Sequence, residues 1–225
     1  MKNLSDIHKN ISLIYGCMSE EYTEQRLSCK YINENDIVLE IGGNMGRNAL
    51  VISNILNNDK NLVTLEPNKE FADKLLENRN YNNKNFYIEN SALSKDRIFS
   101  LNSISFKEGT LEKDFPTSYK SINKSNASGV NIIEYKDLIK KYEKNFNVLC
   151  VDCEGAFYYI LKDMKYILDN IRLIIIENDY ENIEHYNYVK NKLDTKFNCI
   201  EQLPLNNPPW PAPCSEYFYQ VWVKK

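Results

Sequence analysis

Short apolar runs that alternate with segments of helical periodicity constrain the fold of this 225-residue chain more than any other feature. The runs that we interpret as strands are 36–41, 61–66, 85–89, 146–152 and 171–177. After most of these runs, apolar residues recur every three or four positions, as in a helix buried on one face. Strands that alternate with helices form a parallel sheet with helices on both faces. We therefore predict an α/β fold with a doubly wound, Rossmann-like sheet.

The two ends of the chain extend this core. The runs 196–203 and 217–225 have no helical pattern between them, so we expect two antiparallel neighbours and an antiparallel C-terminal strand in a mostly parallel sheet. Residues 1–35 are expected to form a helical N-terminal cap, and residues 36–225 the main domain. Residues 103–130 are rich in Ser, Lys and Asn and form a long loop, which suggests a substrate-binding segment.

The first predicted strand stops at a glycine-rich turn, Glu40-Ile41-Gly42-Gly43-Asn44-Met45-Gly46. In an open parallel sheet, ligands bind beyond the carboxyl ends of the strands. A dinucleotide turn needs glycines at its first, third and sixth positions, but here the third and sixth are Asn44 and Arg47. Glu66 closes the second strand, where an acid can accept hydrogen bonds from both hydroxyls of a ribose. The turn thus indicates a nucleoside ligand that is not a dinucleotide.

The spacing Glu-x-Gly-x-x-x-Gly resembles the first motif of class I S-adenosylmethionine-dependent methyltransferases. Further motifs in the right order resemble the FkbM family of these enzymes. They are Glu66-Pro67 after the second strand, Asn90-Ser91-Ala92-Leu93-Ser94 after the third, Asp152-Cys153-Glu154-Gly155 after the fourth, and Glu177 at the end of the fifth. Gly43 takes the place of the alanine that is usual in the family, a small-for-small exchange that we expect to be tolerated.

This resemblance implies methyl transfer from S-adenosylmethionine to oxygen, often to a sugar hydroxyl. It also implies a set of cofactor contacts. Glu40, Gly42, Asn44 and Gly46 would hold the methionine part, Glu66 the ribose, and Ser91 with Ala92 the adenine; Asp152 would lie near the sulfonium, and Gly43, Asn48 and Pro67 complete the cofactor-binding set.

A sugar hydroxyl is weakly acidic, so its methylation needs a base or a Lewis acid. Two alternatives remain open. In the first, Asp152 or Glu154 acts as the base. In the second, Mg²⁺ lowers the pKa of the acceptor, as in catechol-type methyltransferases, which place a metal at these two strand ends. Its ligands would come from Asp152, Glu177, Asn178 and Asp179. His185 is a further candidate base, although a histidine on a helix surface is more often solvated.

Two short motifs suggest other chemistry but stand in the wrong context. Cys150 and Cys153 form a C-x-x-C pair without a second pair of ligands, so we interpret them as buried thiols. Asn207-Pro208-Pro209-Trp210 resembles a motif of amino-methyltransferases, but there the motif follows the fourth strand, whereas here it joins the last two. Trp210 remains a candidate for stacking on a sugar ring.

Composition limits the partners and the location. The net charge of -3 provides no electrostatic footprint for nucleic acid. No apolar run approaches the length of a membrane span, and the charged residues among positions 1–14 argue against a signal peptide. The six cysteines show no disulfide pattern, so we expect a cytoplasmic protein. The sequence does not predict an oligomeric state.

The acceptor that we expect is a small molecule or glycan precursor with a sugar hydroxyl. Lys107, Lys113, Lys120 and Lys124 of the long loop would suit a phosphorylated or nucleotide-linked sugar, unless this loop is simply a solvated surface segment. Two other functions stay open. One is methylation of another small molecule, a protein or a nucleic acid. The other is a non-catalytic cofactor-binding module, against which the intact acidic residues argue.

Overall fold

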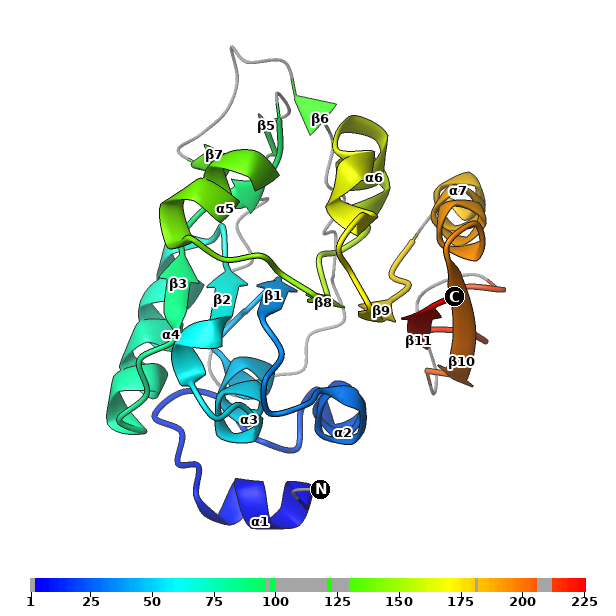
Figure 1. Ribbon diagram of the computed structural model, residues 1–225. Helices are drawn as coiled ribbons and strands as arrows, with labels where there is room; N and C mark the ends of the chain where they lie inside the picture. Colours follow the sequence, from blue (N-terminus) through cyan, green and yellow to red (C-terminus); the bar gives the residue numbers. More distant parts are fainter. Residues whose placement is uncertain (1–2, 96–97, 100–120, 123–129, 181, 206–211) are drawn as a thin grey trace.

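The computed structural model describes residues 3–95, 98–99, 121–122, 130–180, 182–205 and 212–225 (Figure 1). Its centre is a seven-stranded sheet in the order β10-β11-β9-β8-β1-β2-β3. The strands are β1 (Val38–Ile41), β2 (Leu62–Leu65), β3 (Tyr87–Glu89), β8 (Val148–Val151), β9 (Leu173–Glu177), β10 (Phe197–Leu203) and β11 (Tyr219–Lys224). Each predicted strand is present, shortened by one or two residues at most ends, which confirms the Rossmann-like fold.

Strand direction follows the prediction. The five strands β3, β2, β1, β8 and β9 pair in parallel, and β11 inserts antiparallel between β9 and β10. All residues of β1, β2 and β8 are buried, because helices cover both faces of a parallel sheet. Since these strands run the same way, their carboxyl ends lie at one edge. The residues that follow them therefore gather in one place.

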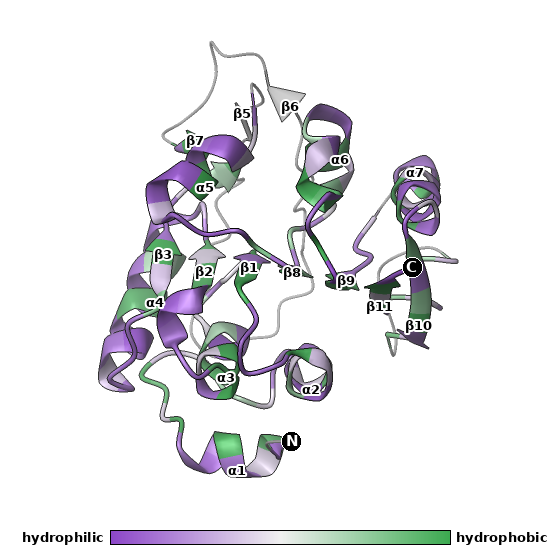
Figure 2. Ribbon diagram, viewed as in Figure 1, coloured by the Kyte–Doolittle hydropathy of each residue, from purple (hydrophilic) through white to green (hydrophobic). Residues whose placement is uncertain are grey.

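Helices form a layer on each face of the sheet (Figure 1). On one face lie α1 (Leu4–Lys9), α2 (Tyr22–Tyr31) and α3 (Arg47–Ile55), and the hydrophobic cluster of this face also includes Leu75 of α4 (Lys69–Tyr81). The other face carries α5 (Tyr135–Tyr142), α6 (Phe157–Asp163) and α7 (Ile183–Asp194). Hydrophilic and hydrophobic residues both occur around these helices (Figure 2), as expected when one side packs on the sheet. The helices α1 and α2 confirm the helical N-terminal cap.

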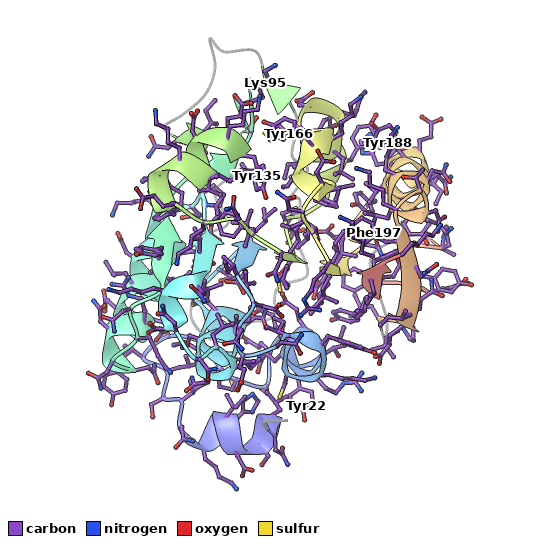
Figure 3. The ribbon with its side chains drawn as sticks, viewed as in Figure 1. Tyr22, Lys95, Tyr135, Tyr166, Tyr188 and Phe197 are labelled. Atoms are coloured by element: carbon purple, nitrogen blue, oxygen red, sulfur yellow. The ribbon has the colours of Figure 1, made fainter. Side chains whose placement is uncertain are left out.

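Several small elements were not predicted. They are the paired strands β4 (Ala92–Leu93) and β7 (Ile132–Ile133), the paired strands β5 (Ile98–Phe99) and β6 (Ser121–Ile122), the short 3₁₀ helix η1 (Asp59–Asn61), and helix α5. A second 3₁₀ helix, η3 (Lys165–Leu168), follows α6. Tyr135 of α5 lies beside Tyr166 of η3, with ring centroids 6.1 Å apart (Figure 3). Two-residue strands are too short to leave a period in the sequence, so pattern reasoning misses them.

Two predicted segments fall largely or wholly outside the described residues. Of the predicted substrate loop 103–130, only β6 and Val130 are described. The Asn207–Trp210 motif lies outside the described residues altogether. Among the helices that the structure does describe, none is long and apolar enough to span a membrane.

Candidate functional site

The glycine turn lies at the carboxyl end of β1 and approaches the neighbouring strand ends closely. The amides of Gly42 and Gly43 both donate to the carbonyl of Leu65, each at 2.9 Å. Gly42 has a φ of +97°, and a Cβ built on it would lie 1.6 Å from the backbone oxygen of Asp152. The turn after β1 and the turn after β8 are thus in backbone contact. Glycine is required here by conformation and by space.

Gly43 is constrained more tightly than the sequence suggested. A Cβ at this position would lie 2.2 Å from the Thr64 hydroxyl oxygen and 2.8 Å from Leu75 Cδ1. Both distances are shorter than non-bonded atoms normally allow. Glycine is the residue that fits this position, because Thr64 of β2 occupies the space that an alanine methyl would need.

Gly43→Ala is expected to lower the free energy of unfolding by about 1–3 kcal/mol, the range for overpacking a buried position. Adding Thr64→Ala removes the closest atom and should recover part of that loss, leaving only the contact with the flexible end of Leu75. Chemical denaturation of the two single variants and the double variant measures the coupling. Strictly additive effects would show that Thr64 does not exclude the alanine.

Glu40 is a buried acid in the middle of the sheet. It stands in register with Thr64 on one side and Cys150 on the other, and its residue is 2% exposed. Asn48 of α3 donates to Glu40 Oε1 at 3.1 Å, whereas Oε2 is buried and has no hydrogen-bond partner in the described part of the chain. Burial raises the pKa of Glu40 to about 8, although the nearby Thr64 and Asn48 side chains oppose the shift. A cationic ligand would satisfy the free oxygen and stabilise the carboxylate.

The pKa of Glu40 predicts a pH dependence of stability. Since the folded pKa is about 8 and the ordinary value 4.5, the folded chain holds a proton that the unfolded chain releases. The resulting stabilisation is complete below about pH 4.5 and is lost as the pH rises to about 8. We expect Glu40→Gln to reduce this fall by roughly 2–4 kcal/mol, because glutamine does not titrate. Denaturant titrations of the wild-type protein and the variant between pH 5 and pH 8.5 test this prediction. If the free energy of unfolding falls equally with pH in both proteins, the prediction is contradicted.

Glu66 follows β2 and connects two turns. Its Oε2 accepts from the Asn44 amide at 2.8 Å, and its Oε1 accepts from the Asn68 amide at 2.8 Å. Burial raises the pKa of Glu66 to about 7, and the two amides oppose the shift. The next residue, Pro67, offers its carbonyl to the Asn90 side chain at 3.2 Å. Glu66 is thus held rigidly beside the glycine turn.

Ser91 and Ala92 lie where the chain leaves β3. The Ser91 hydroxyl donates to Glu89 Oε1 at 2.8 Å, and Ala92 opens the small strand β4. Glu89 also accepts from Lys141 and Tyr142 of α5. Burial tends to raise the pKa of Glu89, but these three hydrogen bonds outweigh it and hold the pKa below its ordinary value. This corner therefore carries a fixed negative charge whose neighbours come from the unpredicted helix α5.

Acidic side chains gather at the ends of β8 and β9. Carboxylate oxygens of Glu24, Asp152 and Glu177 lie within 4.8 Å of one another, and so do those of Asp152, Glu154 and Asp179. Asp152 belongs to both groups. Burial, followed by repulsion from Glu177 and Glu24, raises the pKa of Asp152 well above its ordinary range.

Glu24 was not found from the sequence. It lies on α2 of the N-terminal cap, is buried, and accepts from Asn48 at 2.9 Å. Asn48 thus bridges Glu24 and Glu40. The available signal was the position of Glu24 on the same side of α2 as buried Leu27 and Ser28, three and four residues on. The motifs at the strand ends give no indication of Glu24, because it comes from a helix of the N-terminal cap.

The remaining metal candidates differ in orientation. The side-chain amide of Asn178 donates to the carbonyls of Tyr217 at 2.7 Å and Phe218 at 3.2 Å. These two residues directly precede β11. Asp179 accepts from the Gly155 amide at 2.8 Å with Oδ1, whereas none of the residues that the structure describes forms a hydrogen bond with its buried Oδ2. Asp179 therefore faces the turn that holds Glu154, while the amide of Asn178 has a structural role.

His185 lies apart from these carboxylate groups. Its ring stacks on Tyr158 with a centroid distance of 3.7 Å and meets the edge of Tyr159 at 5.4 Å. Burial and the charge of Lys162 lower the pKa of His185. The imidazole is thus a neutral partner in the packing of α7 on α6. It does not belong to either carboxylate group.

Buried polar atoms that have no hydrogen-bond partner among the described residues surround the glycine turn. They are Glu40 Oε2, Asn44 Oδ1, Asn48 Oδ1 and Thr64 Oγ1. An unpaired buried polar atom is costly, so a set of them beside a turn at the strand ends indicates a ligand that supplies the missing hydrogen bonds. Because the four atoms are mainly acceptors, an ammonium group fits them. The methionine part of S-adenosylmethionine carries such a group.

Comparison with known proteins identifies the fold. No family model and no curated protein matches the sequence. Solved structures do match. An O-methyltransferase from Bacillus cereus, in complex with SAH, covers 100% of this chain and 92% of its own, with 14% identity and a TM-score of 0.50. An rRNA methylase from Streptococcus thermophilus covers 95% of this chain and 99% of its own, with 11% identity and a TM-score of 0.54.

The chain has the class I methyltransferase fold. A Streptococcus mutans protein that was solved with SAH and described as a candidate methyltransferase agrees with this assignment, with 13% identity and a TM-score of 0.54 over 94% of this chain and 100% of its own. At such identities the likeness concerns the arrangement of strands and helices. The chemistry must be argued from the residues at the strand ends.

Proposed function

We propose that this chain transfers a methyl group from S-adenosylmethionine to a hydroxyl oxygen of a sugar or glycan precursor. The observation that carries the proposal is the glycine turn with its buried, unpaired acceptors at the end of β1, within a class I methyltransferase fold. The FkbM-like order of motifs supports the sugar hydroxyl, and the O-methyltransferase among the similar structures supports oxygen as the acceptor atom. The free cysteines are consistent with a cytoplasmic location, which we also propose.

The proposed cofactor contacts follow from the geometry. Glu40 Oε2 and Asn44 Oδ1 would accept from the ammonium of the methionine part. Each oxygen of Glu66 already accepts one backbone amide, yet a carboxylate oxygen has a second lone pair for a ribose hydroxyl. Ser91 and Ala92 would flank the adenine where the chain leaves β3. Gly42, Gly43 and Gly46 would let the backbone approach the ligand.

The proposed chemistry places a proton acceptor beside the acceptor hydroxyl. S-adenosylmethionine supplies an activated methyl group on its sulfonium. The chain orients the hydroxyl and accepts its proton. Asp152 is the carboxylate that we assign to this role, because it is common to both acidic groups at the ends of β8 and β9. Its raised pKa makes it a stronger base once it is ionised. Glu154 is the alternative, and we assign no catalytic role to His185.

Calorimetry with SAH, followed by turnover assays, tests the proposal. We expect binding with a micromolar dissociation constant, weakened at least tenfold by Glu40→Gln and unchanged by the surface control Glu184→Gln. Assays with S-adenosylmethionine and a panel of sugars and nucleotide sugars should yield a methyl ether by mass spectrometry. Absence of SAH binding at high micromolar concentration would contradict the cofactor, and a methylated amine or RNA product would contradict the acceptor.

A metal-assisted version of the reaction is the second candidate, favoured by the two carboxylate groups around Asp152. Oxygen donors of this kind suit Mg²⁺, which would lower the pKa of the acceptor hydroxyl. Glu177, Asp179 and Asp152 would be ligands; Asn178 is the weakest of the four predicted ligands because its amide is engaged elsewhere. Loss of turnover in EDTA and recovery with Mg²⁺ would favour this version, and unchanged turnover in EDTA would exclude it.

A further inference from the structure

The segment between α1 and α2 takes a long path across the molecule. It leaves α1, runs to α4, and returns past the start of α3 before α2 begins (Figure 1). Along this path it contacts residues that belong to the glycine turn or adjoin it. We call residues 12–21 the N-terminal segment.

Asn78 of α4 and Asn82, the residue that caps the C-terminus of this helix, hold the backbone of this segment. Asn82 accepts from the Ser12 amide at 3.0 Å and donates to the Ser12 carbonyl at 2.7 Å. One helical turn earlier, Asn78 accepts from the Tyr15 amide at 3.1 Å and donates to the Tyr15 carbonyl at 3.0 Å. Each side chain therefore accepts one hydrogen bond from a residue of the segment and donates one to the same residue, as a paired β-strand does.

Asn78 differs from Asn82 in its burial and in its further hydrogen bonds. Asn78 is completely buried, and its amide nitrogen donates a further hydrogen bond to the carbonyl of Met45, at 2.9 Å. Met45 lies inside the glycine turn. Asn78 Oδ1 also accepts from the Ile14 amide at 2.8 Å, so all four hydrogen bonds of the side chain are used. The same amide group thus holds the N-terminal segment and the turn.

The rest of the segment also lies against the beginning of α3. A Cβ on Gly16 would lie 3.1 Å from Arg47 Nε, which places the backbone directly on the Arg47 side chain. Arg47 is buried and forms ion pairs with Glu20 and Glu21. The segment therefore cannot leave without exposing Arg47 and breaking three of the four hydrogen bonds of Asn78, whose remaining bond is the one to Met45. Docking of the N-terminal segment and the conformation of the glycine turn are therefore coupled through Asn78 and Arg47.

We propose that Asn78 is a positioning residue that holds the glycine turn in its cofactor-binding shape while the N-terminal segment is docked. This inference rests on the proposed function, since it assigns the turn to S-adenosylmethionine. Cofactor binding and docking of the segment then strengthen each other, because a coupling free energy between two sites is reciprocal. Asn82 secures the segment but has no bond to the turn, so it provides a matched control.

The test compares Asn78→Asp with Asn82→Asp by calorimetry with SAH. Both substitutions keep the acceptor oxygen and remove the amide donor, but only the first removes the bond to Met45. We expect Asn78→Asp to weaken SAH binding about tenfold or more and Asn82→Asp to change it less than twofold. Circular dichroism verifies that both variants are folded. Equal effects of the two substitutions would overturn the proposal.

Hydrogen exchange of the wild-type protein tests the coupling between SAH binding and docking of the N-terminal segment even if Asn78→Asp does not fold. Saturating SAH should slow exchange of the Ile14 and Tyr15 amides at least severalfold, while the amides of α7 stay unchanged. Unchanged exchange of Ile14 and Tyr15 in the presence of bound SAH would overturn the coupling and leave the proposed function intact. Failure of SAH to bind the wild-type protein would instead overturn the proposed function, and this inference with it.

Discussion

Replacing Gly42 with alanine is expected to lower the free energy of unfolding by at least ~3 kcal/mol and to remove SAH binding. Two effects add. The φ of +97° disfavours any residue with a Cβ, and that Cβ would lie 1.6 Å from the backbone oxygen of Asp152. The Asp152 backbone directly follows β8, and its amide donates to the Ile41 carbonyl of β1 at 3.0 Å, so its carbonyl oxygen cannot easily move aside. The turn after β1 must therefore separate from the turn after β8. Thermal and urea unfolding measure the loss.

Gly16→Ala is the matched control for this experiment. Gly16 has a similar φ of +85°, but the three atoms nearest to a Cβ there all belong to the Arg47 side chain, none closer than 3.1 Å, and none is a backbone atom. Its cost should therefore be that of the backbone conformation alone, about 1 kcal/mol. A similar loss for both variants would mean that the contact between the two turns is not what requires glycine at position 42.

Asp152→Asn is expected to reduce turnover at least ~100-fold while SAH affinity changes less than about threefold, because the amide keeps the shape of the side chain but cannot accept the hydroxyl proton. Wild-type turnover should rise with pH, because the raised pKa of Asp152 keeps its carboxyl protonated at lower pH. The residual turnover of the variant should lack this rise. Initial rates between pH 6 and pH 9.5 measure both.

The control for Asp152→Asn is Asp194→Asn. Asp194 ends α7 and pairs with Lys190 on the surface, so its loss should leave turnover within twofold. If Asp152→Asn turns over about as fast as the wild-type protein, Asp152 is not the base, and Glu154 becomes the candidate.

The difference between predicted and observed features has a physical cause at each position. The strand at 148–151 was predictable, since a strand buried on both faces is a continuous apolar run. The crowding around Gly43 was not predictable, because its neighbour Thr64 belongs to another strand, and no local pattern shows which side chain faces it. Glu24 was missed because a helix from the other end of the chain brings it to Asp152. His185 stood near the right strand in sequence but stacks on α6.

By itself, the sequence determined the order of strands and helices, the glycine turn at the end of β1, and the acids that follow β2, β8 and β9. These features are local, because hydrophobic period and backbone conformation depend on neighbours along the chain. The tertiary structure alone decided that Glu24 joins Asp152 and Glu177, that Thr64 crowds any methyl group at Gly43, and that Asn78 ties the N-terminal segment to the turn. Such contacts depend on packing between distant segments, and local periodicity carries no record of them.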